Sequence, residues 1–396
     1  MKNYSEILSS LRADGLYRTL WTSVADGAHI TRDGVKMLNF ATNDYLGISS
    51  DTDMQREFLA SLDGGAFVMS SVSSRLLGGN NPAFAALENW FANAFSAQSG
   101  AEKSCLIFNG GYAANTSVLP ALASSKDAVF CDKLVHASLI DALKLSDAKF
   151  YRYAHNDYSH LRRLLREHRA EFENAFIATE GVFSMDGDFA DIGGLVEIKR
   201  EFDCALYVDE AHSFGVFGNG GLGLCASRGL LGDVDIIMAT LGKAAASQGA
   251  AVITSPQIRD VLINRARGFI FTTAIPPISA LWTLFVCSRF SSPEMAARRE
   301  TLAELSAYLR KILAPETTLG SSQIAPILVG DNAAACRLSR KLLDAGYCAA
   351  AVRYPTVPKN SARIRLSLNA KMSKSELEKF AAEFKNLRQN EIQMAQ

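Results

Sequence analysis

Residues able to bind an anion, hold a proton or form a covalent bond follow several apolar runs of the sequence. Gly110 and Gly111 come directly after the run SCLIF and before a helical pattern. A glycine turn at such a place offers backbone N–H groups and the positive end of a helix dipole to a phosphate. Asp209 ends the run ALYVD, and His212 comes three residues later. Lys243 follows the run DIIMAT among small residues, where a lysine is costly unless it is exposed, paired or covalently engaged.

Three further polar residues take similar positions: Glu180 and Ser184 in TEGVFSMDGD, and His136 in KLVHASLID. Each feature alone has an ordinary explanation, since glycine turns are common, a carboxylate such as Asp209 often caps a helix and a single lysine usually faces solvent. As a set, a phosphate cradle, an acid, a histidine able to stack and a lysine match what pyridoxal 5′-phosphate requires. The lysine then binds the cofactor covalently, the acid keeps its ring nitrogen protonated, and the cradle binds its phosphate.

The elements that must position these residues alternate between short β-rich runs and helical patterns from about residue 100 onward. Candidate strands are Ser104–Phe108, Ala128–Cys131, Asn174–Thr179, Cys204–Asp209, Asp235–Thr240 and Ala250–Thr254. Several are apolar nearly throughout, which is typical of strands buried on both faces of a parallel sheet. Between them, HLRRLLREHRAEFENA places Leu161, Leu164 and Leu165 on one helical face. The pattern predicts an α/β fold with a mainly parallel sheet, at whose strand ends ligands bind.

The C-terminal third predicts a smaller α+β unit. Helical patterns at Met295–Leu313, Ala333–Asp344 and Ser373–Arg388 alternate with candidate strands Ile324–Val329, Ala349–Arg353 and Arg363–Leu368. The segment FTTAIPPIS has two prolines before a helical pattern and predicts the hinge between the two parts. We therefore expect a large cofactor-binding domain at 45–280 and a small domain at 281–396, with the N-terminal residues 1–44 packing on the small domain.

Composition excludes several classes of protein. The chain has 396 residues, 48% of them hydrophobic, and its 41 Lys+Arg balance 41 Asp+Glu, which is globular and not disordered. A net charge of zero gives no general attraction to nucleic acids or anionic membranes. The longest apolar run, Ser279–Cys287, is far shorter than the ~20 residues of a membrane helix, and the N-terminus has no apolar signal region. We expect a cytoplasmic protein that binds neither nucleic acid nor membrane.

The seven cysteines are widely spaced and include no C-x-x-C pair, so we expect buried reduced thiols, without a disulfide framework and without a metal site. Gly218, Gly220 and Gly223 satisfy G-x-G-x-x-G, but the preceding strand ends near Asp209, which favours a glycine-rich surface loop over a dinucleotide site. The tetrapeptide DEAH has no accompanying phosphate-binding loop of the G-x-x-x-x-G-K-[ST] type, so nucleotide hydrolysis is poorly supported. His155 and His160 lie in a polar segment and are expected to be solvated.

Motifs along nearly the whole chain resemble those of the α-oxoamine synthases, which are fold-type I pyridoxal-phosphate enzymes. NDYLG, NGGYAAN, AHND, TEGVFSMDGD, VDEAH, TLGK and FTTAIPP occur in the order of that family. AHND, EGVFSMDGD, ILVGDN and VRYPTVPKNSARIRLSL are most similar to the branch that condenses L-alanine with a pimeloyl thioester in biotin biosynthesis. The sequence departs from the family at Ala244 and Ser73, where glycine is common, and this puts the acyl-chain preference in question.

The resemblance implies a role for each matching residue. Lys243 would hold the cofactor and move the α-proton, Asp209 would pair with the ring nitrogen, His212 would bond the ring hydroxyl and His136 would stack on the ring. Further implied cofactor contacts are Gly111, Tyr112, Ser184 and Thr240, joined by Thr272 or Thr273 of the partner subunit. Implied substrate contacts are Arg18, Asn43, Thr356 and Arg365, with Glu180 and Arg353 as additional candidates.

The resemblance also implies partners: L-alanine, pimeloyl-CoA or pimeloyl-acyl carrier protein, and a second copy of the chain in a homodimer. Two alternatives stay open. One is an α-oxoamine synthase that uses glycine or another acyl thioester, and the other is a protein that keeps the fold but has no catalytic activity. The joint presence of Lys243, Asp209 and His136 speaks against the second alternative.

Overall fold

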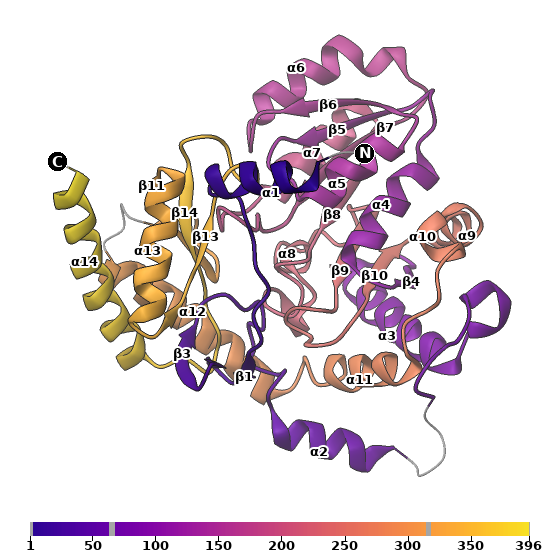
Figure 1. Cartoon of the computed structure of the whole chain (residues 1–396). Coiled ribbons are helices and arrows are strands. Elements are labelled where there is room, and N and C mark those ends of the chain that lie inside the picture. The colour runs from indigo at the N-terminus through magenta and orange to yellow at the C-terminus, as the bar shows by residue number, and fades with distance from the viewer. Residues whose placement is uncertain (1–2, 63–67, 314–317, 396) are drawn as a thin grey trace. The chain divides into compact units, whose positions relative to one another are not determined.

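A computed structural model describes residues 3–62, 68–313 and 318–395 of the chain (Figure 1). These residues divide into two compact units. One unit comprises Met1–Ser50, Met185–Gly187 and Thr301–Gln396, and the other comprises Asp51–Ser184 and Asp188–Glu300. The domain bounds proposed from the sequence, 45–280 and 281–396, stay a prediction.

The second unit is built on a seven-stranded sheet with the order β4-β10-β9-β8-β7-β5-β6. Its strands are β4 (Ser104–Phe108), β5 (Ala128–Asp132), β6 (Lys149–Tyr153), β7 (Ala175–Glu180), β8 (Ala205–Asp209), β9 (Ile236–Thr240) and β10 (Ala250–Thr254). Strands β6, β5, β7, β8 and β9 pair in parallel, and β10 is antiparallel to both β9 and β4. The mainly parallel sheet expected from the sequence is confirmed. Strand β6 was not predicted, because most of this edge strand is exposed and it lacks a continuous apolar run.

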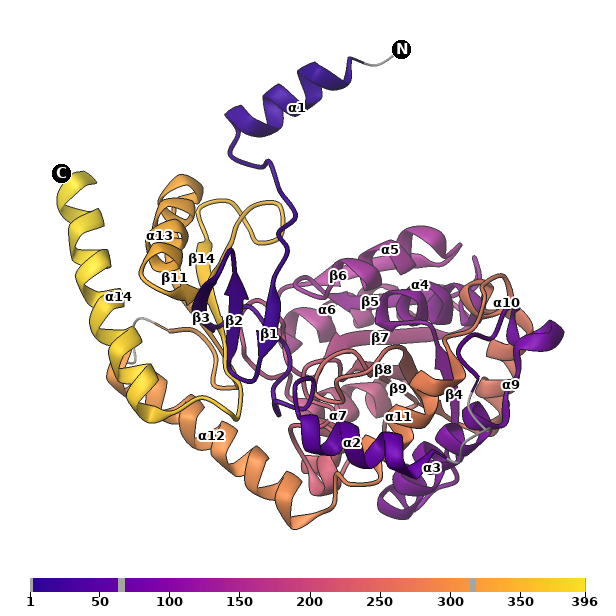
Figure 2. The same cartoon turned by 60° about the horizontal axis from the view of Figure 1, so that its bottom comes forward.

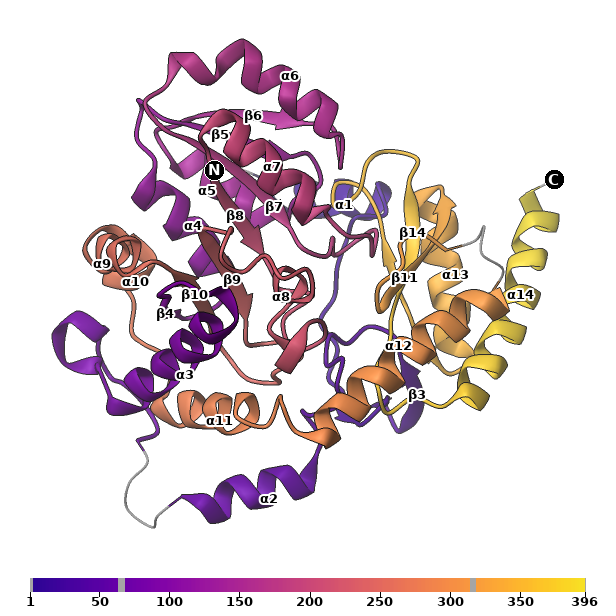
Figure 3. The ribbon, with the colours of Figure 1, turned by 180° about the vertical axis from the view of Figure 1, so that it is seen from behind.

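Helices cover both faces of this sheet. Helices α4 and α5 lie in front of it in Figure 1, and α7 lies in front of it in Figure 3, which is seen from behind. The helices of this unit are α2 (Thr52–Ser61), α3 (Pro82–Ser99), α4 (Gly111–Leu122), α5 (Ala137–Leu145), α6 (Tyr158–His168), α7 (Ile192–Phe202), α8 (Leu224–Ser227), α9 (Pro256–Arg265), α10 (Arg267–Ile270) and α11 (Pro277–Cys287). Short helical turns occupy η1 (Arg75–Gly79), η2 (Arg169–Glu171) and η3 (Asn219–Gly221).

The helix starts of this unit follow from capping side chains. Asn81, Asp157, Asp191 and Ser255 each accept a backbone N–H of the helix that they precede, which satisfies donors that the first turn leaves free. Helix α6 ends at His168, so the helical pattern expected over residues 160–175 was too long.

The first unit contains two smaller sheets, ordered β1-β2-β3-β12 and β11-β14-β13. Figure 2 shows β1, β2 and β3 side by side. The strands are β1 (Val24–Asp26), β2 (His29–Arg32), β3 (Val35–Asn39), β11 (Ile324–Gly330), β12 (Tyr347–Cys348), β13 (Ala350–Val352) and β14 (Ala362–Ser367). The helices of this unit are α1 (Tyr4–Ala13), α13 (Asn332–Asp344) and α14 (Lys374–Ala395). Helix α12 (Pro293–Leu313) begins in the second unit and ends in the first. The predicted C-terminal helices and strands are confirmed to within a few residues, except that the final helix is longer.

Two other expectations can be compared with the structure. All seven cysteines are free thiols, six of them buried and Cys336 half-buried. Within the described ranges, no helix is both long and apolar enough to cross a bilayer.

The glycine-rich loop has a structural role. The Glu210 carboxylate accepts the backbone N–H groups of Leu224 and Cys225 at 2.9 and 2.7 Å and so caps α8. A Cβ at Gly223 would lie 2.8 Å from this carboxylate, which explains a glycine there without any dinucleotide.

Candidate active site

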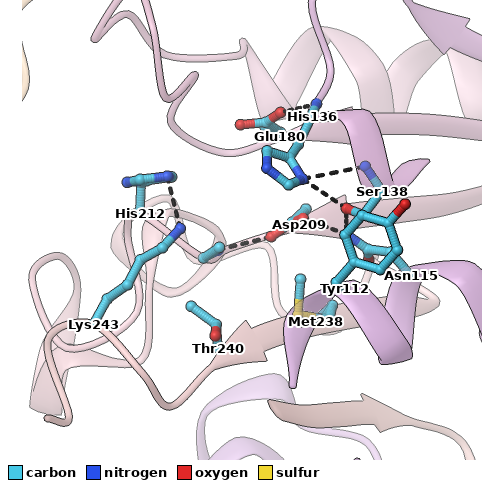
Figure 4. A pocket seen from close by; sticks show the side chains of 12 residues that line it. Tyr112, Asn115, His136, Ser138, Glu180, Asp209, His212, Met238, Thr240 and Lys243 are labelled. Carbon is cyan, nitrogen blue, oxygen red and sulfur yellow. Dashed lines mark hydrogen bonds between the residues drawn. The ribbon is translucent and has the colours of Figure 1, made fainter. Parts of the chain in front are cut away.

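The carboxyl ends of the parallel strands meet around one cavity of the sheet unit (Figure 4). In the register of the sheet, Glu180 on β7 lies opposite Asp209 on β8, and Asp209 lies opposite Met238 on β9. The cavity has a volume of about 170 Å³ and is partly open to solvent. Its lining residues are Gly111, Tyr112, Asn115, His136, Ser138, Glu180, Asp209, Ala211, His212, Met238, Thr240 and Lys243.

One wall of the cavity is the start of helix α4. Gly111 is the first residue of this 12-residue helix, so its turn presents unpaired N–H groups and a positive dipole end. A Cβ at Gly111 would lie 3.4 Å from the Thr240 Oγ1 atom and 3.5 Å from the Met238 Cε atom. The glycine therefore keeps open a space between α4 and the end of β9. The Tyr112 ring is exposed and its hydroxyl bonds the Asp141 carboxylate, so the backbone of Tyr112 is the part available to an anion.

The floor of the cavity holds the buried carboxylate of Asp209. The Asp209 Oδ1 atom accepts the backbone N–H of Ala211 at 2.9 Å, and Oδ2 accepts the Asn115 Nδ2 amide at 2.8 Å. Burial raises the pKa of Asp209, although the nearby Lys243 charge and the hydrogen bonds act in the opposite direction. A protonated ring nitrogen in contact with this carboxylate would offset its desolvation. The turn that follows β8 contains no helix for Asp209 to cap.

Lys243 and His212 lie next to each other on one side of the cavity (Figure 4). The Lys243 Nζ atom lies 2.7 Å from the His212 Nε2 atom. Lys243 stands in a tight turn after β9, where the Ala246 N–H bonds the Lys243 carbonyl at 2.9 Å and the Ser247 N–H bonds the Leu241 carbonyl at 2.9 Å. The small residues that follow Lys243 permit this turn, which directs the amine into the cavity (Figure 4).

His136 and Glu180 form the opposite side of the cavity. His136 precedes helix α5 and caps it, since its Nδ1 atom accepts the Ser138 backbone N–H at 3.2 Å. The Glu180 carboxylate accepts the His136 backbone N–H. Burial raises the pKa of Glu180 to about 8, the Asp209 charge adds to this rise, and Lys243 opposes it. Removal from water lowers the pKa of His136, with Lys243 adding to the effect and Asp209 opposing it.

Together these residues have the chemistry to hold pyridoxal phosphate. The α4 turn and Thr240 suit a phosphate, Asp209 suits a protonated ring nitrogen, and Lys243 supplies a primary amine. Two observations fit pyridoxal phosphate. A Cβ at Gly111 would fill an open space of the cavity, and the buried Asp209 carboxylate has no cation bonded to it among the described residues.

Other predicted site residues lie outside this lining. Ser184 is buried, and its backbone N–H bonds the Glu180 carboxylate. The Asn109 Nδ2 amide bonds the Thr272 Oγ1 atom at 3.2 Å and the Thr273 carbonyl at 2.6 Å, and neither threonine lines the cavity of its own subunit.

The four predicted substrate contacts belong to the other unit. The buried Arg365 guanidinium donates to the Asn43 Oδ1 atom at 3.1 Å, so these two residues come together. Arg18 and Thr356 are exposed. The additional candidate Arg353 donates to the Cys336 Sγ atom at 2.9 Å, which gives it a local structural contact.

Three features of the site region were missed or mistaken. Asn115 and Ser138 line the cavity and were not identified, although both stand in motifs that were quoted and Asn115 follows Gly111 by one helical turn. His155 is not a solvated side chain. Its Nδ1 and Nε2 atoms lie 3.0 Å from Asp132 and 2.8 Å from Asp188, and these partners raise its pKa to about 10 even though burial acts to lower it.

Comparison with known proteins shows which family model and which relatives the chain resembles. The family model described as aminotransferase class I and II matches residues 35–384. Two relatives bear the name "Putative 8-amino-7-oxononanoate synthase". The protein from Haemophilus influenzae is 43% identical over 96% of this chain and 99% of its own length, and the protein from Neisseria gonorrhoeae is 43% identical over 96% and 100%.

Two solved structures resemble the fold. Serine palmitoyltransferase from S. paucimobilis has a TM-score of 0.88 and 23% identity, with 98% of each chain covered. An 8-amino-7-oxononanoate synthase from Francisella tularensis has a TM-score of 0.72 and 28% identity, with 90% of this chain and 99% of that chain covered. These likenesses confirm the fold class expected from the sequence.

Proposed function

Because the chain belongs to the aminotransferase class I and II family and is an α-oxoamine synthase, we propose that it condenses L-alanine with a pimeloyl thioester. The products would be 8-amino-7-oxononanoate, carbon dioxide and the free thiol carrier, as a step of biotin biosynthesis. The observation that carries this proposal is one cavity containing Lys243, Asp209, His136 and the α4 turn, in a chain 43% identical to its relatives over nearly its full length.

The cofactor of this reaction is pyridoxal 5′-phosphate. When bound, it supplies an electron sink for the negative charge that develops at the α-carbon of the amino acid. We propose that Gly111, Tyr112 and Thr240 hold its phosphate, Asp209 keeps its ring nitrogen protonated, and His212 bonds its ring hydroxyl. Ser184 would orient the cofactor through the Glu180 segment to which it is bonded.

Lys243 would be the residue that moves protons. As a free amine, its Nζ atom takes the α-proton of alanine. The α-carbon then forms a bond to the thioester carbonyl carbon, and the carbon–sulfur bond breaks. The thiolate leaves and takes a proton from solvent to give the free thiol. The carboxylate of alanine departs as carbon dioxide, and a proton returns to the α-carbon from the same lysine, which balances the overall reaction.

Other residues would position the two substrates. Arg365 suits the amino-acid carboxylate, because a guanidinium binds a carboxylate with two parallel hydrogen bonds, and Asn43 steadies it. Arg18 and Thr356 are proposed contacts of the acyl substrate, delivered as pimeloyl-CoA or pimeloyl-acyl carrier protein. We propose a homodimer in which Thr272 or Thr273 of the partner subunit completes the phosphate site. The cytoplasmic location expected from the sequence stays a prediction.

The experiment that tests this proposal is a matrix of thiol-release rates. Purified holoenzyme is mixed with L-alanine, glycine or L-serine, each against pimeloyl, acetyl and palmitoyl thioesters, and Lys243→Ala serves as the inactive control. Fastest turnover with alanine and a pimeloyl thioester is expected. Faster thiol release with glycine or with another acyl thioester would assign the protein to another branch of the family. No thiol release with any pair of substrates would favour the alternative of a protein that keeps the fold but has no catalytic activity.

A further inference from the structure

A chain of hydrogen bonds runs from the buried hydroxyl of Tyr207 through Asn115 and Ser138 to the ring of His136 (Figure 4 shows the last three). We infer that Asn115 and Ser138 are positioning residues that fix His136 as its neutral tautomer, with the proton on Nε2. The position of the ring proton follows from which atom donates and which accepts in each of these hydrogen bonds.

The orientation of the Asn115 amide is set at both ends. Its Nδ2 atom lies 2.8 Å from the Asp209 Oδ2 atom, and a carboxylate there accepts and does not donate. Its Oδ1 atom lies 2.5 Å from the Tyr207 hydroxyl, which therefore donates to it. A flipped amide would place two oxygens face to face at Asp209. Asn115 is buried, so no water in bulk competes for these positions.

The same Nδ2 atom has a second hydrogen, which it donates to the Ser138 Oγ atom at 2.9 Å. Since Ser138 accepts there, its own hydroxyl hydrogen is available to the His136 Nδ1 atom at 2.8 Å. The Ser138 backbone N–H also donates to this Nδ1 atom, at 3.2 Å. A backbone N–H can only donate, so Nδ1 must carry a lone pair. The Ser138 hydroxyl therefore donates to Nδ1 as well, and the ring proton lies on Nε2.

The backbone of His136 is also fixed by hydrogen bonds. Its N–H donates to the buried Glu180 carboxylate, and the capping geometry of α5 requires an accepting Nδ1. The lowered pKa of His136, caused by removal from water and by the Lys243 charge, agrees with a neutral ring. In consequence the ring presents an N–H donor at Nε2 and no base at that atom.

What this donor does rests on the proposed function. The Nε2–H group would bind an oxygen that gains negative charge, such as the carbonyl oxygen of the acyl thioester during carbon–carbon bond formation. Because Asn115 bonds Asp209 and Ser138 through one amide nitrogen, the carboxylate proposed for the ring nitrogen also orders the histidine.

The tautomer can be measured by NMR without any activity. The chain has six histidines, so ¹⁵N-histidine holoenzyme gives few ring signals, and those of His136 are identified by their loss in His136→Asn. Two-bond ¹H–¹⁵N correlation distinguishes a protonated from an unprotonated ring nitrogen. We expect an unprotonated Nδ1 and a protonated Nε2. In Ser138→Ala, the Nε2–H to Nδ1–H ratio should fall about fivefold, as expected for loss of one hydrogen bond of ordinary strength.

A matched control is Ser146→Ala, which removes a hydroxyl at the other end of α5 and should leave the His136 ratio unchanged. A protonated Nδ1 in the wild-type chain, or an unchanged ratio in a folded Ser138→Ala variant, would overturn the inference even in an active enzyme. The expected signals in a chain that releases no thiol would uphold the inference and refute the proposed function instead.

Discussion

Replacement of Asp209 by asparagine tests the role of the buried carboxylate with little change of shape. In the wild-type chain each carboxylate oxygen faces a donor, the Ala211 N–H at 2.9 Å and the Asn115 amide at 2.8 Å. The new amide nitrogen therefore faces one of these donors and loses that hydrogen bond. The substitution also removes the charge proposed to hold the proton on the cofactor ring nitrogen.

The substitution should have a small effect on the stability of the apoprotein and a large effect on the activity of the enzyme with its cofactor bound. Loss of a buried hydrogen bond costs about 1 to 3 kcal/mol, but the carboxylate is destabilised by burial, as its raised pKa shows, and its removal offsets much of that loss. The free energy of unfolding of the apoprotein should thus change by less than about 1.5 kcal/mol. Breaking the buried charge pair with the cofactor costs about 3 to 5 kcal/mol, which corresponds to a roughly 100- to 5000-fold loss of kcat/KM.

Three measurements separate these effects: urea unfolding of the apoprotein, titration of pyridoxal phosphate by absorbance, and kcat/KM for thiol release. Asp191→Asn is the matched control, because Asp191 caps α7 away from the cavity and asparagine also caps helices. The reasoning is refuted if Asp209→Asn folds normally, binds the cofactor and retains kcat/KM within about tenfold of wild type.

Three further predictions concern the cavity and its support. Gly111→Ala should weaken pyridoxal phosphate binding at least about tenfold, because its Cβ would fill the space between α4 and Thr240 that is proposed for the phosphate. Gly110→Ala, whose Cβ meets nothing within 4 Å, should not weaken it, and equal affinities of the two variants would contradict the proposed phosphate site. The pKa of Glu180 is raised to about 8, so this side chain loses its proton at a lower pH in the unfolded chain than in the folded chain. The free energy of unfolding of the apoprotein, measured with urea, should therefore fall from pH about 5 to about 8 more steeply in wild type than in Glu180→Gln. The same pH dependence in both proteins would argue against this. His155→Asn should destabilise the chain by about 2 to 3 kcal/mol at neutral pH, measured by urea unfolding, since it leaves Asp132 and Asp188 without their bridging cation; a loss below about 0.5 kcal/mol would disprove the bridge.

Much of the site was predictable because parallel strands end at one edge of a sheet. The runs that precede Gly111, Glu180, Asp209 and Lys243 are apolar enough to identify as strands, and the residues that follow them must then converge. The predicted convergence is what the structure shows around the cavity. The roles of these residues stay proposals.

Other features depend on contacts between distant segments, which no local pattern encodes. Asn115 reaches the cavity only because α4 packs over β8 and β9, where Asp209 and Tyr207 meet its amide. The bridge at His155 joins aspartates at positions 132 and 188, which lie far from it along the chain. Its polar local sequence favoured a solvated side chain, and only tertiary structure supplies the two carboxylates.

The central claim is that this chain forms a carbon–carbon bond at the α-carbon of alanine and releases the alanine carboxylate. The most direct test is mass spectrometry of products from L-alanine labelled with ¹³C either at the carboxylate or at the other two carbons, with pimeloyl-CoA and pimeloyl-acyl carrier protein as donors. The account predicts labelled carbon dioxide and an unlabelled amino ketone from the first substrate, and an amino ketone carrying both labels from the second. An amino ketone that retains the carboxylate label, or the absence of any amino ketone with both donors while Lys243→Ala behaves like wild type, would contradict it.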